Sequence, residues 1–133
     1  MKGLEDFSHV IIIYHLDKAK YGFIFRDDSV LYGRFDKGML VKENKIRIYA
    51  VFHGEVQGVG FRYTARQAAN ALGLTGWVRN EYDGSVSAEI QGDRDSIQEW
   101  LRMVNSGRYI DISHVDMQEI DAIETERNFR VEF

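Results

Sequence analysis

The feature that most constrains the fold is an alternation of apolar residues that gives way to a glycine-rich loop and then to a helical pattern. Apolar residues occupy alternate positions from Ile46 to Phe52, which is the period of a half-buried β-strand. Residues 54–60 then contain three glycines. Residues 64–72 are rich in alanine and stop at Gly73, a common C-terminal signal of a helix. This region therefore begins with a strand, a loop and a helix.

The same reasoning extends to the end of the chain. An Asp-Gly pair at residues 83–84 predicts a turn between two strands. Either Asp93 or Asp95 can cap a helix whose apolar residues recur at helical spacing from Ile97 to Val104. The expected later strands cover residues 75–80, 85–91, 115–120 and 129–133. The order β-α-β-β-α-β with a final strand predicts an α+β, ferredoxin-like split βαβ sandwich, with two helices on one face of an antiparallel sheet.

Residues 1–45 differ in net charge from residues 46–133, with about +1 against −5. We therefore predict a β-rich amino-terminal extension at residues 1–45 and a domain at residues 46–133. Apolar runs predict strands at residues 10–16, 21–25, 30–35 and 39–41, with a hairpin loop at residues 26–29. The simplest role for such an extension is to cover a sheet edge or to mediate self-association.

Composition narrows the function classes. The 133 residues carry 17 basic and 21 acidic side chains, which argues against a nucleic-acid partner bound through phosphate neutralisation. The chain has no cysteine, so thiolate zinc sites and cysteine nucleophiles are excluded. Its longest apolar run, residues 10–14, is too short to span a membrane and does not follow the pattern of a secretory signal. We therefore expect a cytoplasmic protein with no membrane partner.

The loop at residues 54–62 carries the clearest chemical signal. Glycines allow successive backbone N–H groups to converge, and the following helix adds unpaired N–H groups and a positive dipole end. Arg62 would oppose that dipole unless an anion were bound, and a guanidinium can hold two phosphate oxygens. Taken alone, the loop favours the plainer interpretation of a tight turn beside an ordinary surface arginine, because glycine-rich turns are common. Glu55 adds a carboxylate whose direction decides whether it would repel an anion.

A family resemblance changes this balance. The loop VQGVGFR at residues 56–62 resembles the signature loop of the acylphosphatases, and GWVRN at 76–80, DGSV at 83–86 and QG at 91–92 resemble the motifs that follow it. The resemblance covers about residues 46–133. It implies a phosphate-binding loop made by Gln57, Gly58, Val59, Gly60, Phe61 and Arg62. It also implies that Arg62 and Asn80 are catalytic, with Asn80 placing the attacking water.

The implied reaction is hydrolysis of acyl phosphates, which are carboxylic–phosphoric mixed anhydrides, to carboxylate and phosphate, without a cofactor or a metal. Phosphoryl transfer needs mainly positioning and charge stabilisation, which suits such a site. The alternative is a non-catalytic module that binds phosphate or acyl phosphate while the extension recruits a partner. Asn80 also precedes a turn and could be structural. The four histidines are scattered, and we expect no metal site from them.

Overall fold

The computed structural model describes the backbone of residues 10–15, 20–25 and 30–34 and all of residues 45–133. Within residues 45–133, two helices and five strands follow the predicted order. The elements are β4 (Ile46–Glu55), α1 (Phe61–Leu72), β5 (Thr75–Asn80), β6 (Val86–Gly92), α2 (Arg94–Asn105), β7 (Asp111–Ile120) and β8 (Phe129–Glu132).

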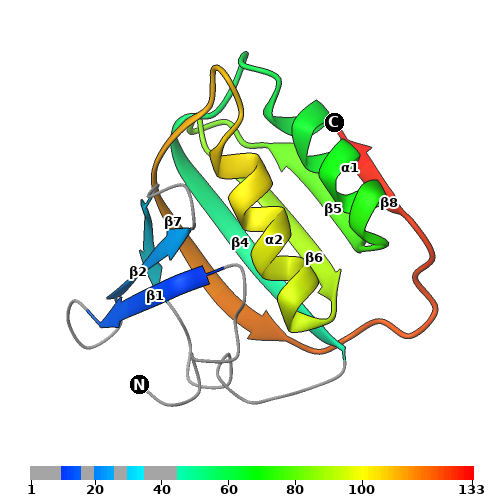
Figure 1. Cartoon of the computed structure of the whole chain (residues 1–133). Helices are drawn as coiled ribbons and strands as arrows, with labels where there is room; N and C mark the ends of the chain where they lie inside the picture. The colour runs from blue at the N-terminus through cyan, green and yellow to red at the C-terminus, as the bar shows by residue number, and fades with distance from the viewer. Residues whose placement is uncertain (1–9, 16–19, 26–29, 35–44) are drawn as a thin grey trace.

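These five strands form a sheet in the order β7-β4-β6-β5-β8, and both helices lie on one face of it (Figure 1). The ferredoxin-like α+β fold is therefore confirmed. The sheet is mixed rather than antiparallel, because β8 runs parallel to β5. Strand β7 ends at the end of the sheet where β5 begins. The connection through residues 121–128 crosses to the far edge there, so β8 enters the sheet in the direction of β5 (Figure 1).

The core lies between the helices and the sheet. The apolar residues that alternate along β4 face the helices and are buried, with Phe52 fully inaccessible. The Phe52 ring contacts Phe61 of α1, with 4.9 Å between ring centroids, and Trp100 of α2 at 5.9 Å. The indole N–H of Trp100 donates to the backbone oxygen of Ala65 at 2.9 Å, so this buried polar group is satisfied. Aromatic packing thus joins both helices to the central strand.

The amino-terminal strands extend the same sheet. Strands β1 (Val10–His15), β2 (Lys20–Phe25) and β3 (Val30–Arg34) pair antiparallel in sequence order. Strand β3 then pairs parallel with β7, through Gly33 with Val115 and Arg34 with Asp116. The predicted loop at residues 26–29 and the predicted strand at residues 39–41 lie outside the described residues.

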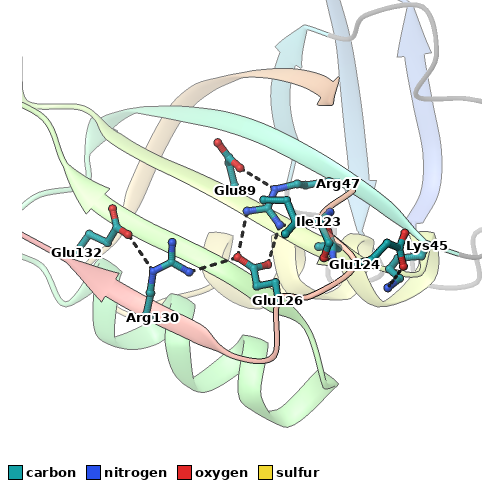
Figure 2. A network of polar contacts seen from close by, with 9 residues as sticks. Lys45, Arg47, Glu89, Ile123, Glu124, Glu126, Arg130 and Glu132 are labelled. Atoms are coloured by element: carbon teal, nitrogen blue, oxygen red, sulfur yellow. Dashed lines mark hydrogen bonds and ion pairs between the residues drawn. The ribbon is translucent and has the colours of Figure 1, made fainter. Parts of the chain in front are cut away.

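The face of the sheet opposite the helices carries a buried ionic network around Arg47 (Figure 2). Arg47 is only 1% exposed. Its guanidinium donates to Glu89 at 2.6 Å and, through two nitrogens, to both carboxylate oxygens of Glu126 at 2.7 and 3.2 Å. It also donates to Gln91, whose side-chain amide exchanges two hydrogen bonds with the backbone of Ile123. The network therefore fastens the β7–β8 connection over the sheet.

The charges in this network are held ionised by one another. Burial alone would lower the pKa of Arg47, but hydrogen bonds and charge attraction from Glu126 and Glu89 raise it above its ordinary value. Burial likewise would raise the pKa of Glu126, but hydrogen bonds from Arg47 and Thr75 lower it below its ordinary value. Removing Arg47 would therefore take the buried cation from two carboxylates at once and leave Glu126 with its 3.3 Å ion pair to Arg130.

We predict that Arg47→Met lowers the free energy of unfolding by about 3–5 kcal/mol, because Glu89 and Glu126 both lose their buried cation. The ion pair of Glu126 with Arg130 remains. The measurement is urea unfolding. The double variant Arg47→Met, Glu126→Gln should recover part of the loss. The control is Lys45→Met, since the Lys45–Glu124 pair is exposed and such pairs contribute about 0–1 kcal/mol. A loss below 1 kcal/mol for Arg47→Met would contradict this account.

Candidate functional site

The loop between β4 and α1 is anchored at both ends in the core. Val56 and Phe61 are 1% and 2% exposed, whereas Gly58 and Gly60 lie at the surface. Gly58 and Gly60 have φ angles of 74° and 82°, in the left-handed region that glycine tolerates best. Helix α1 begins at Phe61, earlier than the alanine-rich stretch predicts, because Phe61 packs on Phe52 and its burial outweighs its weak helix propensity.

The backbone of this loop presents donors without protein partners. Within the described part of the chain, no hydrogen bond joins the N–H groups of residues 57–60 to another protein group. Helix α1 has no side-chain cap at Gly60 and no acidic residue in its first turn. Unpaired N–H groups and an uncompensated positive dipole end are the two components of an anion site. The loop has both.

Arg62 lies in the first turn of α1 and is half-buried. The central carbon of its guanidinium lies 5.1 Å from the centroid of the Phe133 ring, a cation–π contact. The end of the chain lies beside the start of α1 (Figure 1). The contact with Phe133 therefore restrains the Arg62 side chain at the end of the helix that carries the loop.

Asn80 reaches the same end of the sheet from β5, where it is the last residue of the strand and is half-buried. Parallel pairing of β5 with β8 places Arg79 opposite Glu132, so Asn80 and Phe133 follow at one edge. Phe133 contacts Arg62. The topology thus places Arg62 of α1 and Asn80 of β5 at the same end of the molecule, although they lie on different elements.

Gln57 joins the loop to the β5–β6 hairpin. Its side-chain amide donates to the backbone oxygens of Glu81 at 2.7 Å and Ser85 at 2.8 Å. Glu81 directly follows Asn80, so the amide clamps the loop to the turn that carries Asn80. Both amide hydrogens of Gln57 are used in this way, so its side-chain amide nitrogen is committed to the hairpin. The sequence analysis did not predict this contact, because no local pattern indicates that Gln57 reaches Glu81 and Ser85, which lie 24 and 28 residues further along the chain.

The hairpin turn holds two ionised carboxylates. Hydrogen bonds from the hydroxyl and the backbone N–H of Ser85 lower the pKa of Asp83. Hydrogen bonds from the Ser87 hydroxyl and from Arg79 lower the pKa of Glu81. Neither group is therefore arranged to donate a proton at neutral pH. Glu55 ends β4 with an exposed side chain, which fits the interpretation that it points to solvent.

The fold and this loop define an α+β protein of ferredoxin-like architecture with a strand–helix loop able to hold an anion. A family model for acylphosphatases matches residues 48–131, and the chain belongs to the acylphosphatase family. An acylphosphatase from Bifidobacterium longum is 44% identical over 90 residues, covering 66% of this chain and 93% of the relative. One from Salinibacter ruber is 43% identical over 86 residues, covering 64% and 90%.

Solved structures agree with this assignment. The crystal structure of acylphosphatase from Bacillus subtilis superposes with a TM-score of 0.62 and 28% identity, covering 66% of this chain and 99% of that one. An acylphosphatase structure from Coxiella burnetii gives a TM-score of 0.61 and 38% identity, covering 67% and 94%. None of the helices in the described part of the chain is long and apolar enough to cross a membrane.

Gly54 controls how β4 enters the loop. It has a φ of 122° and sits at an irregularity in the pairing of β4 with β7. A Cβ added there would lie 2.3 Å from the backbone oxygen of Asp111 and 2.6 Å from the backbone nitrogen of Ser113. Both neighbours are backbone atoms, so the strands themselves would have to separate.

We predict that Gly54→Ala lowers the free energy of unfolding by about 2 kcal/mol or more, because strained φ/ψ alone costs of order 1–3 kcal/mol and the clash adds to it. The control is Gly73→Ala at the end of α1, where φ is also positive but the added Cβ meets nothing within 4 Å. We expect it to cost about 1–2 kcal/mol. Chemical unfolding of both variants checks the difference, and equal losses would contradict the close approach.

Proposed function

We propose that this chain hydrolyses acyl phosphates, with the β4–α1 loop and Arg62 holding the phosphoryl group and Asn80 placing the attacking water. Membership of the acylphosphatase family supports the reaction. The observation that carries the division of roles is the joint placement of Arg62 and Asn80 at one end of the sheet, beside a loop of unpaired N–H donors. Water would attack phosphorus, the anhydride P–O bond would break, and carboxylate and phosphate would leave.

Arg62 and the loop would act on the charge of the substrate. Phosphoryl transfer spreads negative charge over three oxygens, and preorganised donors aimed at those oxygens stabilise the transition state. The loop supplies N–H groups and the α1 dipole, and Arg62 supplies a positive charge able to hold two oxygens. The contact with Phe133 reduces the freedom that Arg62 would lose on binding.

Asn80 would act on the water. A side-chain amide offers two donors and one acceptor oxygen, so it can orient a water without taking its proton. Its position depends on the β5–β6 hairpin, which Gln57 clamps to the phosphate loop. The leaving carboxylate is a weak base that needs no protonation, so the absence of a general acid in the described hairpin is compatible with this reaction.

Kinetics of single variants test these roles on a small acyl phosphate. We predict that Arg62→Ala lowers kcat/KM by at least about 100-fold and weakens inhibition by inorganic phosphate, because it removes a transition-state donor and a ground-state charge. Asn80→Ala should lower kcat by about 100-fold while phosphate inhibition stays within about threefold. The matched control is Arg66→Ala, an exposed arginine one turn further along α1, which should keep kcat/KM within about twofold.

Two outcomes would contradict the proposal. A folded wild-type chain that binds phosphate through Arg62 but does not turn over acyl phosphates would make it a binding module. A folded Asn80→Ala variant with full kcat would remove the water-placing role. Circular dichroism and the unfolding midpoint of each variant separate these results from a loss of structure.

We further propose that the extension at residues 1–45 is a unit added to the domain at residues 46–133, that it mediates self-association, and that the protein is cytoplasmic. Strand β1 stands at one end of the strand order, and the edge of such a strand can pair with a second copy. We predict a concentration-dependent dimer in sedimentation velocity that is lost when residues 1–44 are deleted. Unchanged sedimentation and solubility after the deletion would contradict self-association through this segment.

A further inference from the structure

Two histidines that the sequence separates widely meet on the face of the sheet opposite the helices. In the antiparallel pairing of β4 with β7, His53 stands directly opposite His114. The neighbouring pair, Phe52 with Val115, is fully buried on the helix side, so the histidines lie on the other side. Asp116 follows two residues along β7 on the same face. The histidines are scattered along the sequence, but the pairing of β4 with β7 brings these two together.

The ligand atoms of this cluster converge. One ligand atom from each of His53, His114 and Asp116 lies within 4.8 Å of the other two. The Nε2 atom of His53 is 3.4 Å from the Oδ2 atom of Asp116, and the Nε2 atom of His114 is 3.8 Å from the same oxygen. Neighbouring ligands around a tetrahedral ion with bonds of about 2.0–2.1 Å are about 3.3 Å apart. Rotation of these half-exposed side chains, including a turn of at least one imidazole out of the stack, would bring the three ligand atoms to one ion.

The two rings lie side by side, and at least one would have to turn to bind a shared ion, because imidazole lone pairs lie in the ring plane and parallel planes do not converge. The two imidazoles stack with centroids 4.3 Å apart and planes 10° from parallel. Each neutral imidazole has one ring nitrogen that can serve as a metal ligand. The convergence of the three ligand atoms favours a cation here.

We propose that His53, His114 and Asp116 form a binding site for a divalent transition-metal ion of the Zn²⁺ type. Imidazole ligands favour zinc, copper and nickel, whereas magnesium and calcium prefer oxygen ligands throughout. Three protein ligands leave a fourth position for water. The site lies at the same end of the sheet as Asn80 but on the face opposite the helices, and the proposed hydrolysis of acyl phosphates includes no step at its ion.

The expected consequence is a metal cross-link between β4 and β7 beside the Gly54 irregularity. His53 directly precedes Gly54, so the ion would secure the strand pair from which the phosphate loop departs. Unfolding separates the two strands and dissolves the site, so bound metal stabilises the folded chain. Zinc should therefore raise the unfolding temperature of the full chain.

Titration of the full-length, metal-free protein tests the site. We expect isothermal titration calorimetry with Zn²⁺ to give one ion per chain, and a saturating excess to raise Tm by about 5 °C or more. Mg²⁺ should give neither effect. Co²⁺, used as a spectroscopic probe, should develop the visible absorption of a tetrahedral site.

Variants on the same strand locate the ligands. His114→Gln and Asp116→Asn should each weaken Zn²⁺ binding at least tenfold and abolish most of the Tm increase. The matched control is Gln118→Ala, an exposed residue on β7 two positions beyond Asp116, which should bind within twofold of wild type. Because His114 is exposed and Asp116 half-exposed, these variants should fold even if His53→Gln does not.

The proposal fails if full-length protein binds no Zn²⁺ below 1 mM, or if binding is unchanged in both His114→Gln and Asp116→Asn. It also fails if the binding is lost in a His9→Gln, His15→Gln variant and kept in His114→Gln. Hydrolysis of acyl phosphates by the metal-free protein is measured in parallel. Its presence or absence reports on the Arg62 and Asn80 site alone.

Discussion

The pairing of β4 along its length with both β6 and β7 is the constraint on which the rest of the structure depends. The double register determines which side of β4 faces the helices, and a shift of one residue would exchange the two faces. With the observed register, Phe52 enters the core between Phe61 and Trp100, while Arg47 and His53 point to the opposite face. Gly54 then lets the backbone pass close to β7 just before it enters the loop.

The two faces of the sheet are stabilised by different physics. The helix face buries apolar and aromatic side chains, whose removal from water is the main favourable term in folding. On the other face, the buried Arg47 pairs with Glu89 of β6 and with Glu126 of the β7–β8 connection. The pair with Glu126 holds that connection against the sheet. That connection delivers β8 alongside β5, and β8 leads to Phe133 beside Arg62. The candidate catalytic arginine is therefore restrained by a chain of contacts that begins at the opposite end of the sheet.

Much of the fold was predictable because the signals are local. Alternation identified β4, and the Asp-Gly turn identified the β5–β6 hairpin. Of the two predicted caps of α2, Asp93 is the one observed, since its side chain accepts a hydrogen bond from the backbone N–H of Ser96. Trp77 of β5 is half-buried, with Arg79 stacked on its ring. A strand pattern indicates which residues share a face, but not whether another layer covers that face.

The sequence by itself determined the element order, the glycine loop and the family motifs that single out Arg62 and Asn80, since periodicity and turn chemistry act between near neighbours. Only the tertiary structure decided the parallel entry of β8, the Gln57 clamp, the buried position of Arg47 and the meeting of His53 with His114. Each of these depends on strand register or on a chain crossing between distant segments. Such contacts arise from the packing of the whole sheet and leave no periodic trace in the residues that make them.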